Sequence, residues 1–213
     1  MAEPHYERVA VFDGTGRATG ALPREEAKRS GHALGAVNVL LVNARGELLL
    51  QKRPADKENG GRWDKSVGGH VSAGEDFDAT AVREAGEELF DDPASPRVVL
   101  AGDEAAFRAE LAGADLRETV VFRRASHQRN LRDVRRGPDG ALRNVVYHVS
   151  IYLGRTDVPL ESFRPQASEI AGLGYFAPRA LDEMLLRAEL APNMGFLWLT
   201  HARALLELAE RRA

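Results

Sequence analysis

The sequence of 213 residues contains no cysteine, which excludes disulfide bonds, thiolate zinc sites and a cysteine nucleophile. It also has no apolar run near the roughly 18–20 residues that a membrane-crossing helix needs. The first residues, Met-Ala-Glu-Pro-His, lack the basic and then apolar layout of a signal peptide. We therefore expect a cytoplasmic protein with no membrane partner.

Positive charge is not in excess either. The chain has 29 Lys and Arg against 32 Asp and Glu, for a net charge of −3. General nucleic-acid binders are usually basic, so we expect no nucleic-acid partner. Hydrophobic residues make up 44% of the chain and charged residues 29%, which is a globular balance with enough apolar mass for a core.

Apolar and β-branched runs between turn residues predict the strands, and amphipathic runs predict the helices. The predicted strands are 7–12, 17–22, 36–42, 47–53, 97–101, 119–123, 144–154 and 172–176, and the predicted helices are a short one after Pro23, then 76–90, 178–189 and 195–212. Residues 63–67 are weakly strand-like and end at Gly68-Gly69. The segments 54–62 and 124–141 predict loops. Strands mixed with a few helices indicate a single α+β or α/β domain.

The helix predicted at 76–90 carries three glutamates on one face. Glu84, Glu87 and Glu88 stand at i, i+3 and i+4, where like charges cost a few tenths of a kcal/mol per pair. A hard divalent cation bound by oxygen ligands would offset that repulsion. For an arbitrary pattern of this kind, the commoner interpretation is a solvated helix face.

The wider spacing separates these interpretations. Gly69, five residues, Glu75, seven residues, Arg83-Glu84, two residues and Glu87-Glu88 resemble the Nudix box, with a strand and a glycine pair before it. Two positions depart from that signature, because Phe90 replaces its glycine and Asp91 its last apolar residue. The glycine normally leaves the helix with a positive φ, so we expect residues 91–93 to make the exit another way.

The resemblance implies a fold of the α+β class, a Nudix-type α/β/α sandwich with a mixed central sheet. It also implies an extra N-terminal hairpin and a C-terminal helix. We expect one domain over 1–213, with a core at 36–176, an N-terminal extension at 1–35 and C-terminal helices at 177–213.

The resemblance further implies hydrolysis of a nucleoside diphosphate linked to another group, with Mg²⁺, or Mn²⁺, activating the attacking water. Glu75 and Arg83 would orient the ligands. The proton would go to Glu87 or to Glu169, which lies in a loop before a late strand. The implied metal ligands are Glu84, Glu87, Glu88 and the Gly69 carbonyl.

Weaker candidates lie outside the box. Arg53 could face the cleft, and His70 could touch a phosphate or a metal, although a lone histidine is more often structural. Residues 117–143 carry eight arginines against three acids, which suits phosphate binding or a solvated loop. Four aromatic residues could stack on a base but are more often core: Trp63, Phe122, Tyr147 and Tyr152.

Residues 36–91 are most similar to the Nudix branch near isopentenyl diphosphate isomerase. That enzyme uses a cysteine where Gly68 stands and acidic residues in the region of 144–147, and this chain has neither. An isomerase-like enzyme is therefore the runner-up, and a non-catalytic nucleotide-binding Nudix domain is a further alternative. The sequence leaves the substrate open and a homodimer possible.

Overall fold

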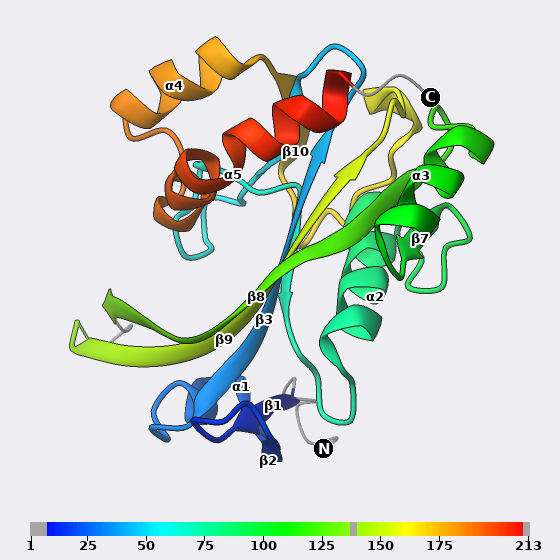
Figure 1. Ribbon diagram of the computed structural model, residues 1–213. Coiled ribbons are helices and arrows are strands. Elements are labelled where there is room, and N and C mark those ends of the chain that lie inside the picture. The colour runs from blue at the N-terminus through cyan, green and yellow to red at the C-terminus, as the bar shows by residue number, and fades with distance from the viewer. Residues whose placement is uncertain (1–7, 137–139, 211–213) are drawn as a thin grey trace.

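The computed structural model describes residues 8–136 and 140–210, so parts of the segments predicted at 7–12, 124–141 and 195–212 lie outside the described residues. A ten-stranded mixed sheet runs in the order β10-β4-β3-β9-β8-β7, with β1, β2, β5 and β6 off this path (Figure 1). The strands are β1 Arg8–Phe12, β2 Ala18–Pro23, β3 Ala33–Val42, β4 Leu48–Lys52, β5 Trp63–Asp64, β6 Val67–His70, β7 Val98–Ala101, β8 Val120–Arg136, β9 Leu142–Arg155 and β10 Gly172–Phe176. The helices are α1 Arg24–Ala27, α2 Phe77–Phe90, α3 Glu104–Gly113, α4 Pro178–Leu186 and α5 Pro192–Glu210, with a 3₁₀ turn at Leu160–Ser162.

Strand β3 explains why helices cover both faces of the sheet. Its successive side chains point to opposite faces. One set, with Val37 and Val39, packs on α2, while the other, with Leu40 and Val42, belongs to the cluster that contains Trp198 of α5. β3 pairs in parallel with β9 and antiparallel with β4 and β6. This arrangement confirms the predicted α+β class and mixed sheet.

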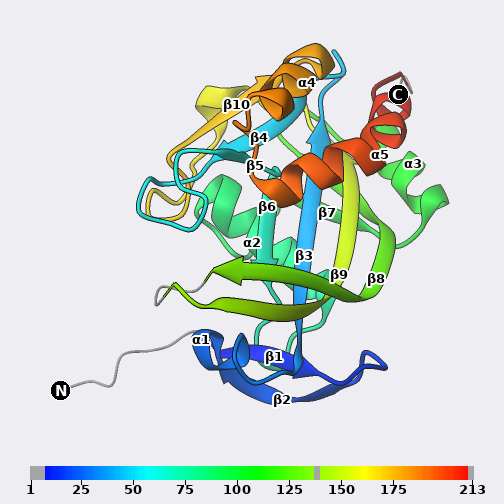
Figure 2. The same cartoon turned by 90° about the vertical axis from the view of Figure 1, so that its left-hand side faces the viewer.

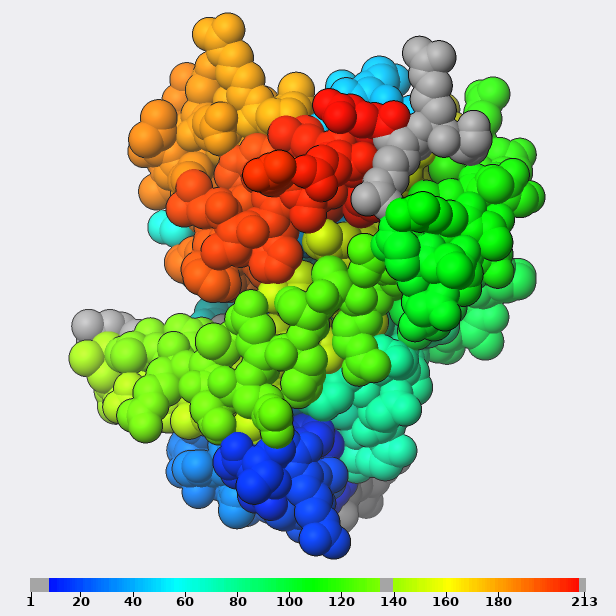
Figure 3. Space-filling model, in the orientation of Figure 1, coloured from blue at the N-terminus to red at the C-terminus, as the bar shows by residue number. Residues whose placement is uncertain are grey.

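Residues 124–136 contradict the prediction of a loop over 124–141. β8 continues to Arg136 and pairs antiparallel with β9, with register shifts between Arg124 and Ser126 and between Gln128 and Leu131. Pairing with β9, which is distant in sequence, supplies the backbone hydrogen bonds of this strand, and the arginine-rich sequence itself gives no sign of strand formation. The resulting ribbon curves away from the sheet toward the N-terminal hairpin (Figure 2). The surface is hollowed between this ribbon and α5 (Figure 3).

Two further elements differ from the sequence prediction. The pair Gly68-Gly69 does not break a strand but lies inside β6, which is held by four pairings with β3. Helix α3 was not predicted at all, although the Asp103 side chain caps it by accepting from the Ala106 amide at 2.8 Å. Within the described part of the chain, no helix is both long and apolar enough to cross a membrane.

Candidate active site

Helix α2 presents the box residues because both of its ends are fixed. At its start the Asp76 side chain accepts from the Ala79 amide at 2.8 Å, and the Thr80 hydroxyl donates to Glu75 at 2.9 Å. Ala85 and Leu89 are fully buried against the sheet. This orientation leaves Arg83, Glu84 and Glu87 partly exposed, whereas Glu88, which was expected on the same face as Glu84 and Glu87, turns toward the sheet.

Arg83 holds three carboxylates with one guanidinium. Its Nε lies 2.8 Å from Glu75 Oε1, its Nη2 3.0 Å from Glu84 Oε1 and its Nη1 2.7 Å from Glu87 Oε2. Burial works against the charged guanidinium, but the hydrogen bond to Glu75 and the charges of Glu84 and Glu87 raise the pKa of Arg83 overall. Repulsion between the box glutamates is therefore offset by a cation that the chain itself supplies.

Glu88 is buried beneath this cluster. Its Oε2 accepts from the Gly68 amide at 3.0 Å and from the Gln51 side-chain amide at 3.3 Å. Burial raises the pKa of Glu88 well above 4.5, and the nearby charge of Glu84 adds to the shift. The third box carboxylate is thus a desolvated group that needs a cation to carry its charge.

The two glycines of β6 let charged side chains reach the backbone from opposite faces. A Cβ on Gly69 would overlap the Glu84 carboxylate, and a Cβ on Gly68 would overlap the end of the Lys65 side chain. Successive residues of a strand face opposite sides, so Glu84 and Lys65 lie on either side of the strand. This close approach is the local reason for glycine at both positions.

The residues present fit a hard divalent cation in their chemistry. In the described residues no three acidic or histidine side chains converge on one point as they stand, because Arg83 lies among Glu75, Glu84 and Glu87. The side chains of Glu84 and Glu87 are only 12% and 32% exposed, so neither points into bulk solvent. Carboxylate oxygens within one helical turn, beside the Gly69 backbone, are the donors that Mg²⁺ prefers. Metal ligation by these groups stays a prediction.

The exit from α2 differs from the expectation. Asp91 itself adopts the left-handed conformation, with φ of 53°, so the chain does leave the helix with a positive φ, one residue after the box position of Phe90. The amides of Asp91 and Asp92 donate to the carbonyls of Glu87 and Gly86, each at 3.1 Å. Aspartate tolerates this conformation better than most residues with a Cβ. The missing box glycine is therefore replaced by a neighbour.

Arg53 and Glu169 both form contacts with the loop at 53–62. Arg53 Nε donates to the Glu58 carbonyl at 2.6 Å, and its Nη1 lies 3.2 Å from Asp64 Oδ2. Glu169 is paired with Lys57 at 2.8 Å on the surface. Neither of these contacts reaches a box glutamate, so the predicted roles of Arg53 in binding and of Glu169 in proton transfer stay predictions.

The candidate aromatic residues are mostly core. Phe122 and Tyr152 are fully buried, with ring centroids 5.8 Å apart, so they are core residues, which is the commoner of the two interpretations, and do not offer a face to a base. Trp63 packs edge-on against Phe176 at 4.6 Å. Tyr147 is buried, and its ring centroid lies 6.0 Å from that of the half-buried His70. A contact of His70 with phosphate or metal stays a prediction.

The structure adds two residues that sequence reasoning missed. Gln51 donates to Glu88, and Lys65 lies beside Asp64 with Nζ 3.3 Å from Oδ1. Neither belongs to a recognisable motif, because a buried lysine or glutamine on a strand has no characteristic spacing.

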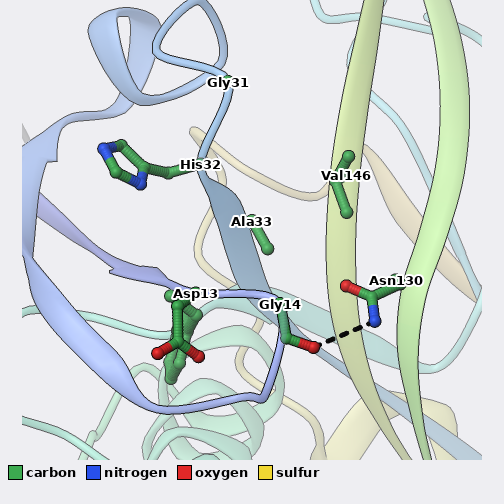
Figure 4. Close-up of a pocket in the computed structure, with 8 residues that line it drawn as sticks. Asp13, Gly14, Gly31, His32, Ala33, Asn130 and Val146 are labelled. Atoms are coloured by element: carbon green, nitrogen blue, oxygen red, sulfur yellow. Dashed lines mark hydrogen bonds between the residues drawn. The ribbon is translucent and has the colours of Figure 1, made fainter.

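A separate hollow of about 230 Å³ lies between the N-terminal hairpin and the β8–β9 ribbon (Figure 4). One wall carries the Gly14 carbonyl, which accepts from the Asn130 side-chain amide at 3.1 Å. The lining contains no box residue: it comprises Phe12, Asp13, Gly14, Gly31, His32, Ala33, Asn130 and Val146.

Comparison with known proteins agrees with the box. The family model described as NUDIX domain matches residues 32–194. An uncharacterized Nudix hydrolase of Pseudomonas aeruginosa, PA4841, is 40% identical over 84 residues, which are 39% of this chain and 50% of that protein. An isopentenyl-diphosphate Delta-isomerase of Pectobacterium atrosepticum is 33% identical over 82 residues, which are 38% and 46% of the two chains. The matches thus span about half of each relative.

A solved structure shows the same fold over nearly the whole chain. The protein DR0079 of Deinococcus radiodurans is 19% identical, with a TM-score of 0.60 over 96% of this chain and 100% of that one. At this identity the likeness concerns the fold alone.

Proposed function

The chain belongs to the Nudix family, and we propose that it hydrolyses the diphosphate bond of a small nucleoside diphosphate linked to another group. The observation that carries the proposal is the cluster in which Arg83 gathers Glu75, Glu84 and Glu87 above the buried Glu88. A cluster of this charge suits divalent cations that bind a diphosphate. The substrate is a small molecule rather than a nucleic acid.

Glu84, Glu87, Glu88 and the Gly69 carbonyl would hold Mg²⁺ or Mn²⁺. Such an ion supplies charge neutralisation on the diphosphate and lowers the pKa of a bound water. Glu75 keeps Arg83 in place through two hydrogen bonds, at 2.8 and 3.1 Å, whichever partners the guanidinium later exchanges. The Gly68 amide holds Glu88 from the strand side.

Glu87 is the group we assign to receive the proton of the attacking water. Its side chain is more exposed than that of Glu84, at 32% against 12%, and it is paired with Arg83 at 2.7 Å. The alternative acceptor, Glu169, is paired with Lys57. The variant Glu169→Gln therefore separates the two: it should keep most of the activity if Glu87 is the base.

The test is the release of phosphate or nucleoside monophosphate from a panel of nucleotide sugars, dinucleotides, coenzyme A derivatives and oxidised nucleoside triphosphates, with Mg²⁺ or Mn²⁺. We expect Glu87→Gln to lower the rate on the best substrate by about 10²–10⁴-fold, as expected for loss of a general base or metal ligand. Glu110→Gln, an exposed glutamate of α3, should leave it unchanged. If no compound is hydrolysed, the hydrolase proposal fails and the alternative, a non-catalytic nucleotide-binding Nudix domain, is favoured.

Similarity to an isomerase makes one more assay necessary. The matching segment is 33% identical to an isopentenyl-diphosphate Delta-isomerase, but the end of Lys65 occupies the space that a side chain at position 68 would need. We therefore expect no isomerisation of isopentenyl diphosphate by the full chain. The full chain is the right sample, because Val11 of β1 and Trp198 of α5 lie in one core cluster, in line with the single domain we propose. Conversion of that diphosphate would establish the runner-up function.

A further inference from the structure

The segment between β6 and α2 contributes a side chain to the cluster that the box spacing does not include. The box specifies Gly69 and Glu75 and leaves the residues between them open. The Ser72 hydroxyl nevertheless accepts a hydrogen bond from Arg83 Nη2 at 3.2 Å. Glu75 Oε2 accepts from the same nitrogen at 3.1 Å. Two residues outside α2 therefore hold one end of the guanidinium.

The backbone of the N-terminal hairpin holds Ser72 in place. The Ala10 amide of β1 donates to the Val71 carbonyl at 2.8 Å. The Ala73 amide donates to the Arg8 carbonyl of β1 at 3.0 Å. The turn that leads into α2 thus lies beside β1 (Figure 1). Because both neighbours of Ser72 are bonded to β1, the hairpin fixes the direction in which its side chain points.

Apolar packing fixes the same segment. The Val71 side chain is fully buried in a cluster with Ala10 and Phe12 of β1. The Phe12 ring centroid lies 5.6 Å from that of Phe77, the first residue of α2. The hairpin therefore supports both the segment that carries Ser72 and the start of the box helix. It precedes the residues that the family model matches, 32–194, so this support comes from outside the matched part of the chain.

The hydrogen bonds of Arg83 fall into two groups. Glu84 and Glu87 are predicted metal ligands, whereas Ser72 and Glu75 are not. The Nη2 nitrogen has two hydrogens and three acceptors within 3.2 Å, on Ser72, Glu75 and Glu84. If Glu84 turned to an ion, the two hydrogens would match the two acceptors that remain. A serine hydroxyl is uncharged, so it can direct the guanidinium without adding a carboxylate that competes for the ion.

We propose that Ser72 is a positioning residue of the active site, which together with Glu75 fixes the Arg83 guanidinium once the glutamates of α2 bind metal. The N-terminal hairpin acts through Ser72, although it contributes no ligand of its own. This inference rests on the proposed function, in that the box glutamates are taken to bind metal and Arg83 to act in the hydrolysis.

The first test is a cycle of variants of the full chain, assayed with Mg²⁺ and the best substrate of the panel. We expect Ser72→Ala to lower kcat about tenfold, as for the loss of one hydrogen bond to a charged group. KM should change little, because no group that binds substrate is removed. Ser72→Thr keeps the hydroxyl and should keep most of the activity. In an Arg83→Met background, Ser72→Ala should lower kcat no further.

The matched control is Ser30→Ala. It removes a hydroxyl that donates to the Ala27 carbonyl at 2.8 Å, at the end of α1, and should leave kcat unchanged. Thermal unfolding shows whether each variant is folded, and Arg83→Gln replaces Arg83→Met if the latter is not.

A second readout needs neither metal nor substrate. In EDTA, urea denaturation gives the free energy of unfolding of the wild type, Ser72→Ala, Arg83→Met and the double variant. We expect the two losses to be non-additive, because both single changes remove the same hydrogen bond. A serine that only stabilises the turn would give additive losses.

The inference is overturned if Ser72→Ala keeps the full kcat or if Ser72→Thr loses as much as Ser72→Ala does. It is also overturned if the effects of Ser72→Ala and Arg83→Met are additive in kcat or in unfolding free energy. These outcomes are separate from the proposed function. If no diphosphate is hydrolysed, the function fails and the cycle in EDTA still decides whether Ser72 holds Arg83, whereas hydrolysis with additive effects refutes the role of Ser72 alone.

Discussion

At the scale of single residues, the site is a set of charges held close to the backbone. Gly68 and Gly69 admit Lys65 and Glu84 on opposite sides of β6, and Arg83 joins the carboxylates of α2. Burial and charge act in opposite directions on these groups. Glu75 remains below its usual pKa despite partial burial, because Arg83 and Thr80 donate to it, whereas burial dominates at Glu88.

Glu88 makes the stability of the metal-free protein depend on pH. Burial raises the pKa of Glu88 in the folded protein above 4.5. Protonated Glu88 therefore favours the folded state fully at a pH below the pKa that it has in the unfolded chain. This contribution to stability is lost as the pH rises through the pKa of Glu88 in the folded protein. In EDTA, the unfolding free energy of the wild type should therefore fall relative to that of Glu88→Gln as pH rises above about 4.5. Urea denaturation between pH 4 and 8 measures the difference. Parallel curves would contradict the prediction, and Glu110→Gln provides the exposed control.

The box residues could be located from the sequence because their spacing is specific, but the side chains and backbone groups that surround them could not. Gln51 is separated from Glu88 by 37 positions in the chain, and Gly68 by 20. Asp64 and Lys65 are neighbours in the sequence, yet no sequence pattern indicates that both side chains are buried. Burial of polar side chains depends on tertiary packing, which no local period encodes.

At the scale of elements, local signals predicted the apolar strands and the box helix, and non-local pairing determined the rest. The strand β10 matches its predicted residues, 172–176, and α2 begins within one residue of the predicted start. The arginine-rich end of β8 has no two-residue apolar period, so its strand form depends on β9. The chain leaves α2 at the residues expected, 91–93, but no pattern indicates that the Asp92 carbonyl then packs closely against Gly86 of the helix.

The close contact between Asp92 and Gly86 predicts that an alanine at position 86 lowers the stability of the protein. Alanine is normally favoured over glycine in a helix by about 1 kcal/mol. In Gly86→Ala, however, the new Cβ would overlap the Asp92 carbonyl, so we expect a loss of about 2 kcal/mol in the free energy of unfolding. The matched control is Gly113→Ala in α3, where a Cβ meets no atom within 4 Å and stability should stay equal or rise. Urea denaturation checks both, and a stabilised Gly86→Ala would refute the overlap.

At the scale of the whole molecule, a buried histidine fastens the N-terminal hairpin to the sheet. His148 of β9 is fully buried, its Nε2 donates to the Asp13 carbonyl at 2.8 Å, and its Nδ1 accepts from the Asn130 amide at 3.3 Å. Arg129 adds a bond to the Thr15 carbonyl at 2.6 Å. The hairpin, the ribbon and the central sheet therefore meet at one side chain.

Replacing this histidine should loosen the hairpin. In His148→Leu the backbone amide of Asn130 loses its partner, at a cost of about 1–3 kcal/mol if it stays buried, and the Asp13 carbonyl keeps only its bond from the Gly16 amide. We expect a lower melting temperature and earlier proteolytic cleavage between β1 and β2. His32→Leu, which alters an exposed histidine nearby, should change neither. Equal cleavage rates for the two variants would show that the hairpin is held elsewhere.

Arg83 bridges Glu75, Glu84 and Glu87, and in the proposed function this arrangement would govern how the protein takes up metal. An arriving ion would meet carboxylates that already have a positive partner, so loading would be an exchange of cations rather than the filling of a bare acidic surface. The displaced guanidinium would stay bound to Glu75 and could turn toward the phosphates of a bound substrate. In a medium depleted of divalent ions the chain should thus persist as an intact apoprotein that can be charged when metal returns.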